Sequence, residues 1–172
     1  MAARSVSVGI VLGSASDWPS VEPAAALLQE WGIGFEVVVA SAHRAPRRVH
    51  AYAQDAAGRG LKVIIAVAGA AAHLAGVLAA ETTLPVIGVP LTGSPLQGLD
   101  SLLSTVQMPA GVPVATMALG SAGARNAAIF AAQILALSDP RLKEVLKRHK
   151  QDLEQEVAQQ GEKIPPEFRG KS

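Results

Sequence analysis

Five short apolar runs, rich in β-branched residues and largely without polar alternation, limit the folds open to this chain more than any other feature. They span residues 5–12, 35–39, 63–67, 85–89 and 112–118. A strand that buries one face alternates apolar and polar residues, whereas a continuous apolar run is typical of a strand covered on both faces. Helical patterns separate the runs, so the sequence predicts a parallel sheet with helices on both sides.

The segments between the runs carry helix signals. Residues 18–31 have helical spacing, and 46–60 begin with proline in the first turn and end on glycine. A small-residue loop over 68–72 leads into a helix that begins at about His73, and an alanine-rich helix is expected over 122–137. The predicted fold class is α/β: a three-layer α/β/α sandwich around a flavodoxin-like, doubly wound parallel sheet, with a C-terminal helical extension.

A length of 172 residues fits one domain with a sizeable core. We therefore predict a single domain over 1–172. Its core covers about 6–138, a charged C-terminal helix covers about 139–160, and a loose tail covers 161–172.

The formal net charge of +1 gives the chain no overall attraction to nucleic acid or to an anionic membrane. Cysteine is absent, which excludes disulfides, thiolate metal sites and a cysteine nucleophile. The N-terminus lacks the apolar-then-small pattern of a signal peptide, so we expect no targeting segment and a cytoplasmic location.

The charges are unevenly placed along the chain. Residues 1–138 carry seven basic and seven acidic side chains, while 139–172 carry eight and seven. So few charges in residues 1–138 indicate that much of the surface of this part is buried by other protein. We expect the other protein to be further copies of the same chain. The alternative is a surface that is polar but uncharged.

One stretch is long and apolar enough to be weighed as a membrane span. Residues 63–80 contain only one polar side chain, that of His73. Alanine makes up eight of its 18 residues, two glycines interrupt it, and a histidine would lie at mid-bilayer. A buried strand, a tight loop and a buried helix explain it better.

Polar or small residues follow the first three predicted strands. These segments are residues 13–17, 41–46 and 68–73. In open α/β sheets, ligands bind outside the carboxyl ends of the strands. The three loops together offer hydroxyls, backbone N–H groups, one arginine, two histidines and one aspartate, so the sequence predicts a ligand site at this edge.

The first two loops suit an anionic ligand. Gly13, Ser14 and Ser16 at a helix start can offer N–H and O–H donors to an anion. Arg44 can add a planar, bidentate charge for phosphate. Asp17 can accept hydrogen bonds from sugar hydroxyls or can serve only as the N-cap of its helix.

His43 lies on a loop, where an imidazole that titrates near neutral pH suits proton transfer. The alternative is a loop histidine that bonds locally. His73 opens a helix in an apolar setting, and a structural role is equally open. Ser14 or Ser41 as a nucleophile is disfavoured because no G-x-S-x-G elbow exists. The four histidines lack metal-ligand spacing, so no metal site is expected.

Ordered motifs extend over about residues 6–150. They include Gly13-Ser14-x-Ser16-Asp17-Trp18, Ser41-Ala42-His43-Arg44-x-Pro46, Ala71-Ala72-His73-Leu74-x-Gly76, Leu84-Pro85-Val86-Ile87-Gly88-Val89-Pro90 and Gly123-Ala124-x-Asn126-Ala127. Together they closely resemble the PurE family of purine biosynthesis. The resemblance implies a three-layer α/β/α fold assembled as an octamer, with no metal and no organic cofactor.

Within the family, the Ser-Ala-His-Arg motif resembles the class I mutases, because class II carboxylases usually carry lysine where Arg44 stands. The resemblance implies an isomerase of de novo purine (IMP) biosynthesis, N5-carboxyaminoimidazole ribonucleotide mutase. In that reaction the carboxylate leaves nitrogen as CO2 and is re-added to ring carbon C4. The alternatives are an aminoimidazole ribonucleotide carboxylase that uses free CO2 and a non-catalytic nucleotide-binding paralogue.

The resemblance also implies residue roles. His43 would be the general acid–base, and His73 with the third loop would enclose CO2. Ser16, Ser41 and Arg44 would hold phosphate and nearby polar atoms, and Asp17 would bind ribose hydroxyls. The catalytic pair is therefore His43 and His73, and the implied substrate-binding residues are Gly13, Ser14, Ser16, Asp17, Ser41, Ala42, Arg44, Gly69, Ala70, Ala72 and Leu74.

Departures from the family pattern concentrate in the third loop. Val67 and Ala70 stand where the family usually has glycine, and Ala75 stands where it has proline. Ala45 replaces a usual threonine beside the His-Arg pair. Glycine is used where φ is positive or where backbone approaches a ligand, so Ala70 is expected to narrow the CO2 pocket or change the path of the loop. A slow or redirected enzyme is the consequence to test.

Overall fold

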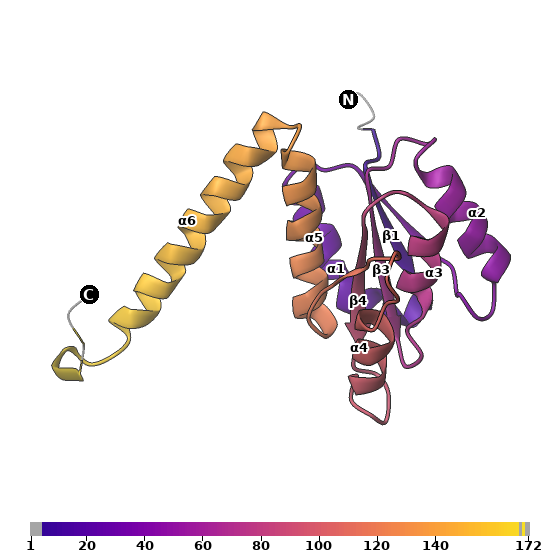
Figure 1. Ribbon diagram of the computed structural model, residues 1–172. Coiled ribbons are helices and arrows are strands. Elements are labelled where there is room, and N and C mark those ends of the chain that lie inside the picture. The colour runs from indigo at the N-terminus through magenta and orange to yellow at the C-terminus, as the bar shows by residue number, and fades with distance from the viewer. Residues whose placement is uncertain (1–4, 169, 171–172) are drawn as a thin grey trace.

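The computed structural model describes residues 5–168 and 170 of the chain (Figure 1). Five parallel strands form one sheet in the order β2-β1-β3-β4-β5. This order is that of a doubly wound, flavodoxin-like sheet, so the predicted fold class is confirmed. The strands are β1 (Val8–Leu12), β2 (Phe35–Val39), β3 (Val63–Gly69), β4 (Val86–Leu91) and β5 (Ala115–Thr116).

Helices cover both faces of the sheet (Figure 1). One face is covered by α1 (Trp18–Glu30) and α5 (Gly120–Ala136), and the other by α2 (Pro46–Ala56) and α3 (Leu74–Glu81). The remaining helical elements are α4 (Leu99–Val106), α6 (Pro140–Glu162) and the 3-10 helices η1 (Ala15–Asp17) and η2 (Pro166–Phe168).

The central strand β3 shows why its sequence lacks polar alternation. Val63, Ile65 and Val67 pack into the core beneath α1 and α5. Ile64 and Ala66 point to the other face and pack beneath α2 and α3. Successive side chains of a strand point to opposite faces, so a strand covered on both sides needs apolar residues throughout. Residues 63–80 accordingly form β3, a loop and α3, as expected, and no helix in the described part of the chain is long and apolar enough to cross a membrane.

The high alanine content is concentrated where helices pack closely on the sheet. The buried face of α5 is built from one glycine and six alanines. Small side chains let this helix approach α1 and the sheet closely, with little area buried by each residue. The buried small residues of α5 are Gly123, Ala124, Ala127, Ala128, Ala131, Ala132 and Ala136.

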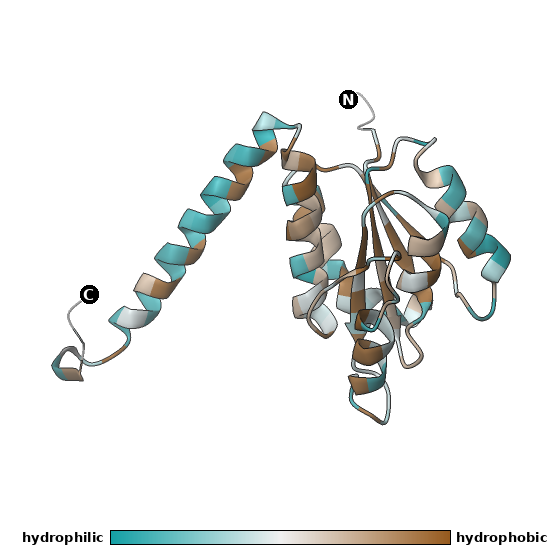
Figure 2. Ribbon diagram, viewed as in Figure 1, coloured by the Kyte–Doolittle hydropathy of each residue, from teal (hydrophilic) through white to brown (hydrophobic). Residues whose placement is uncertain are grey.

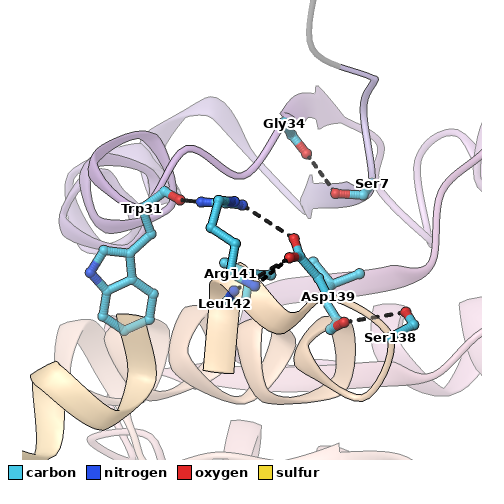
Figure 3. A network of polar contacts seen from close by, with 8 residues as sticks. Ser7, Trp31, Gly34, Ser138, Asp139, Arg141 and Leu142 are labelled. Atoms are coloured by element: carbon cyan, nitrogen blue, oxygen red, sulfur yellow. Dashed lines mark hydrogen bonds and ion pairs between the residues drawn. The ribbon is translucent and has the colours of Figure 1, made fainter. Parts of the chain in front are cut away.

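The last helix, α6, leaves the body as an arm (Figure 1). Its base is anchored, because the Asp139 carboxylate accepts from the N–H groups of Arg141 at 2.9 Å and Leu142 at 3.4 Å. Arg141 Nη1 also donates to the carbonyl of Trp31 at 2.7 Å (Figure 3). Leu142 is buried, whereas the rest of the arm presents mostly hydrophilic residues with a minority of hydrophobic ones (Figure 2).

Several predicted boundaries were wrong. The first strand begins at Val8, not at residue 5, and the predicted strand over 112–118 shrinks to β5. Pro113 has no N–H to donate to a ladder, which is consistent with the late start of β5. The predicted loose tail is partly regular, because α6 continues to Glu162 and η2 follows. Residues 1–4, 169, 171 and 172, on which the expectations about targeting and the tail partly fall, lie outside the described residues.

Helix α4 was not predicted. Its N-cap is Gly98 in a left-handed conformation with φ of 92°, and a glycine has no side chain with which to cap the helix. The usual start signal of a serine, threonine, asparagine or aspartate N-cap is therefore missing. With only eight residues, α4 also offers little periodicity to detect.

Candidate active site

A cavity of about 660 Å³ lies at the carboxyl ends of the strands. Four segments line it: those after β1, β2, β3 and β4. Doubly wound sheets bind their ligands at this edge, so the cavity lies where the sequence predicted a site. The lining residues are Gly13, Ser14, Ser16, Asp17, Ser20, Ser41, Ala42, His43, Arg44, Ala68, Gly69, Ala70, Ala71, Leu74, Leu91, Thr92 and Gly93.

The first loop is held by a capping box around η1. The Ser14 side chain accepts from the backbone N–H of Ser16 at 3.4 Å, and the Ser14 N–H donates to Asp17 Oδ2 at 2.9 Å. Asp17 makes no side-chain cap for α1, so of the two roles left open by the sequence the structure does not show the helix cap. The reason is that the extra turn η1 precedes α1 and places Asp17 at its third position, facing back toward Ser14.

Asp17 is partly buried, and this burial raises the pKa of its carboxyl above the ordinary 3.8. The Ser14 N–H and the Arg44 guanidinium act in the opposite direction and lower that pKa, but burial is the larger cause. A raised pKa means that the folded protein binds this proton more tightly than the unfolded chain does. Protonation of Asp17 therefore adds to the free energy of unfolding. This contribution is complete below pH 3.8 and is lost as the pH rises through the pKa of Asp17 in the folded protein.

Asp17→Asn is therefore expected to raise the melting temperature of the ligand-free protein at pH 7, by a few degrees at most. The amide keeps an oxygen for the Ser14 N–H and removes the partly buried charge. Thermal unfolding at pH 7 and pH 4 checks this, and the gain should shrink at the lower pH. A lower melting temperature for the variant at pH 7 would contradict the account.

The second loop, residues 41–46, places Arg44 beside the first loop, residues 13–17. Arg44 Nη2 donates to the carbonyl of Gly13 at 3.0 Å, and Nε donates to Ser41 Oγ at 3.3 Å. Ser41 Oγ also accepts from the backbone N–H of Arg44 at 3.3 Å. Ala45, the N-cap of α2, makes no side-chain cap bond, so the contacts between Ser41 and Arg44 hold this part of the second loop. These hydrogen bonds hold the guanidinium in one orientation, so its positive charge is already directed to the cavity before a ligand binds.

The two predicted catalytic histidines are in direct contact, although 30 positions separate them in the sequence. His43 Nε2 lies 2.8 Å from His73 Nδ1, and the rings meet edge to face with centroids 5.0 Å apart. His73 is the N-cap residue of α3, but its side chain does not cap that helix. Both residues are exposed in the single chain, and His43 lines the cavity whereas His73 does not.

The third loop carries the departures noted above. Ala70 has φ of 53°, in the left-handed region that favours glycine. Val67 is fully buried beneath α1 and α5, so this replacement of a family glycine lies outside the cavity. Ala72 does not line the cavity: it is buried, and its carbonyl accepts from Thr105 Oγ1 at 3.5 Å. The expected effect on the loop therefore rests on Ala70.

Ala70→Gly is expected to stabilise the protein by about 1 kcal/mol, because a left-handed conformation costs an L-residue roughly 1–2 kcal/mol and glycine offsets part of the gain through its unfolded-state entropy. Urea unfolding measures the difference. Ala71→Gly is the matched control, since Ala71 has no positive φ and glycine there should be destabilising. Equal losses of stability in both variants would contradict the interpretation of Ala70 as strained.

Four residues that line the cavity lie outside the segments that the sequence predicted to form it and are not among the site residues implied by the resemblance. The predicted segments follow the first three strands and do not include the segment after β4. A polar loop after the fourth predicted strand was the available signal, while Ser20 on α1 had none. The missed residues are Ser20, Leu91, Thr92 and Gly93, whereas Ala68 and Ala71 lie in the predicted segment 68–73.

Over residues 5–168 and 170, no group of three or more histidine, aspartate or glutamate side chains is placed to hold a metal ion. The chemistry offered by the cavity is instead that of hydroxyls, one guanidinium, one carboxyl and one imidazole. This set can bind a phosphorylated, hydroxylated ligand and can move a proton.

The fold places the chain among doubly wound α/β proteins, and its cavity lies at the edge of the sheet where such proteins bind their ligands. The family described as AIR carboxylase matches residues 7–156. A relative from Pseudomonas aeruginosa, named N5-carboxyaminoimidazole ribonucleotide mutase, is 56% identical over 144 residues, which cover 84% of this chain and 88% of the relative. A Bacillus subtilis relative of the same name is 50% identical over 157 residues, covering 91% and 97%.

A solved structure agrees with these sequence matches. The crystal structure of Treponema denticola PurE superposes with a TM-score of 0.81 at 26% identity and covers 91% of this chain and 97% of that chain. The protein therefore belongs to the AIR carboxylase family, and the resemblance to PurE proteins stated from the motifs is confirmed.

Proposed function

We propose that this protein is an isomerase, N5-carboxyaminoimidazole ribonucleotide mutase, acting in purine (IMP) biosynthesis in the cytoplasm. One observation carries the proposal: an exposed imidazole, an anchored guanidinium and a set of hydroxyls line one cavity at the ligand-binding edge of the sheet. Relatives that bear the mutase name support it, because they share about half of all residues over most of this chain.

The first two loops bind the ribonucleotide. Arg44 offers a charge-assisted contact to the phosphate, and Ser16 and Ser41 offer hydroxyl groups beside it. Asp17, whose Oδ2 already accepts from Ser14, has further acceptor capacity for ribose hydroxyls. The imidazole ring of the substrate would then extend toward His43.

The third loop encloses the carbon dioxide. Gly69, Ala70 and Leu74 line the cavity with small or apolar groups, and CO2 has no net charge to be balanced. A small apolar pocket beside the reacting atoms keeps CO2 near the ring carbon, which raises its effective concentration.

His43 carries the proton. As the bond between N5 and the carboxylate carbon breaks, its electron pair returns to N5, which takes a proton from the His43 imidazolium, and CO2 is released. The ring carbon C4 then attacks CO2 with the electrons of the enamine system and forms a carbon–carbon bond. Neutral His43 removes the C4 proton, the ring regains its aromaticity, and the imidazolium is restored, so no net proton is consumed.

We also propose that the protein is a homo-oligomer, an octamer by resemblance, with no nucleic-acid or membrane partner. Leu99, Leu103 and Val106 leave an exposed apolar stripe on α4, and Leu153 and Val157 are exposed on the arm α6. Such patches are typical of surfaces that another protein covers. Light scattering should give about 140 kDa, eight times the 17.6 kDa of one chain. Leu103→Glu should lower this mass, whereas the same charge introduced on exposed α2 by Gln54→Glu should not.

The proposed function is tested by measuring the conversion of substrate to product through the change in ultraviolet absorbance. The protein is supplied either with N5-carboxyaminoimidazole ribonucleotide or with aminoimidazole ribonucleotide and bicarbonate. Turnover of the first substrate without added bicarbonate is the expected result. Product formed only from the second mixture would indicate a carboxylase, and binding without turnover would indicate a non-catalytic paralogue. Either of these results would overturn the proposal.

A further inference from the structure

We propose that His73 is a positioning residue that holds His43 in the tautomer with its proton on Nε2, so that His43 Nδ1 is the atom that gives and takes the catalytic proton. This inference rests on the proposed function of the same site. It starts from the 2.8 Å contact between His43 Nε2 and His73 Nδ1, which has room for one hydrogen atom between two nitrogens.

The direction of this hydrogen bond follows from two requirements. A neutral histidine generally prefers its proton on Nε2. If both rings are in this tautomer, His43 Nε2–H donates the hydrogen bond and the unprotonated His73 Nδ1 accepts it. When His43 becomes an imidazolium, both of its nitrogens carry protons, so Nε2 can only donate. The same hydrogen bond therefore serves the neutral and the charged state, and neither ring has to turn during the reaction.

The backbone around His73 suits a fixed acceptor. Its N–H donates to the carbonyl of Ala71 at 2.9 Å, and its own carbonyl accepts from Val77 at 3.0 Å as the first turn of α3. The far end of α3 is tied to α2 by the contact between His50 Nδ1 and Glu81 Oε2 at 2.9 Å. His43 lies on the loop that leads into α2, so one helix pair places both imidazoles.

The proton count of the reaction matches this arrangement. One proton leaves the pair when CO2 is released, and one returns when C4 is deprotonated. With Nε2 committed to His73, His43 Nδ1 is the position at which this proton is exchanged. A neighbour that fixes the tautomer and supports the imidazolium is a known way to make histidine an effective acid–base.

The other charged groups around the pair are few. Asp17 and Arg44 are the charged side chains among the residues that line the cavity. Arg44 is directed toward Gly13 and Ser41 by its hydrogen bonds. On α2, Arg47 and Arg48 are exposed, and on α3 the carboxylate of Glu81 faces His50 at the opposite end. His73 is thus the described side chain that bonds to the His43 ring.

Two substitutions of His73 distinguish the effect of its hydrogen-bond acceptor, Nδ1, from the effect of the shape of its ring. His73→Phe keeps an aromatic ring but removes the acceptor, whereas His73→Asn keeps an oxygen near the position of Nδ1. His73 is exposed and its side chain makes no cap bond to α3, so both variants should fold. We expect His73→Phe to lower kcat on the order of 10- to 100-fold with little change in KM. His73→Asn should recover most of that loss.

The pH–rate profile supplies a readout that a purely structural role would not change. A hydrogen bond from a charged donor stabilises the imidazolium, so its loss lets the acid form disappear at lower pH. The kcat/KM profile of His73→Phe should therefore differ from the native profile on its basic limb, whereas that of His73→Asn should stay close to it. Equal profiles in native protein and His73→Phe, or no advantage of asparagine over phenylalanine, would overturn the inference.

Nitrogen-15 NMR of labelled histidines in the ligand-free protein tests the pair without using activity. The neutral His43 ring should carry its proton on Nε2 in the native protein and in His73→Asn, and a second population with the proton on Nδ1 should become detectable in His73→Phe. A mixture in the native protein would overturn the inference. An inactive native protein whose His43 tautomer is nonetheless fixed would instead count against the proposed function alone.

Discussion

His43→Asn is expected to lower the turnover of N5-carboxyaminoimidazole ribonucleotide by about 10²- to 10⁴-fold, which is the usual contribution of a general acid–base. Asparagine is polar and of similar size, but its amide neither gives nor takes a proton near neutral pH. The site of the change is exposed, so the fold and the binding residues Arg44 and Asp17 should be unaffected. Initial rates by ultraviolet absorbance measure the loss, and calorimetric titration with the substrate measures the binding that remains.

The matched control for this variant is His50→Asn. His50 belongs to the same helix pair but contacts Glu81 and lies outside the cavity. Its turnover should remain within a few-fold of the native rate. Substantial turnover by His43→Asn, comparable with that of the control, would mean that another group performs the proton transfers.

Gly123→Ala is expected to destabilise the protein by about 3 kcal/mol, the upper part of the range for overpacking a buried site. A Cβ atom at this position would lie 1.6 Å from the carbonyl oxygen of Ala118, and that neighbour is backbone, which cannot move aside as a side chain can. Gly123 is buried in the first turns of α5, where the helix begins to cover the sheet. Alanine's better helix propensity, worth about 1 kcal/mol, works against this loss but is too small to reverse it.

Ser121→Ala provides the control for Gly123→Ala, since Ser121 is exposed on the same helix. Its stability should change by no more than about 0.5 kcal/mol in either direction. Urea unfolding of the three proteins at one protein concentration compares them, because assembly makes apparent stability depend on concentration. A Gly123→Ala variant as stable as the native protein would show that α5 can shift away from Ala118 at little cost.

Much of the fold was predictable because burial leaves a direct mark on the sequence. A strand such as β3, apolar on both faces, can lie only between two helical layers, and the glycine and proline residues between runs mark the turns. The elements that were missed or misplaced lack such marks. Helix α4 begins at Gly98 without a side-chain cap, and the short pairing of β5 depends on contacts with β4. Tertiary contacts of this kind do not show in local sequence.

The candidate site was predictable only in part, for a related reason. Gly13, Ser41 and His43 could be placed together because the carboxyl ends of parallel strands meet at one edge. The contact between His43 and His73 could not, because it depends on how two loops fold toward each other across 30 residues. The left-handed φ of Ala70 was also hidden, since an alanine gives no local indication of a conformation that glycine normally adopts.

The central claim is that the carboxylate moves from nitrogen to carbon without leaving the cavity. It is tested most directly by supplying N5-carboxyaminoimidazole ribonucleotide with a carbon-13 label in its carboxylate, in the presence of excess unlabelled bicarbonate. Mass spectrometry of the product then shows where the label has gone. We predict that the 4-carboxylate of the product retains the label, whereas a product that has lost it to the solution would contradict the account.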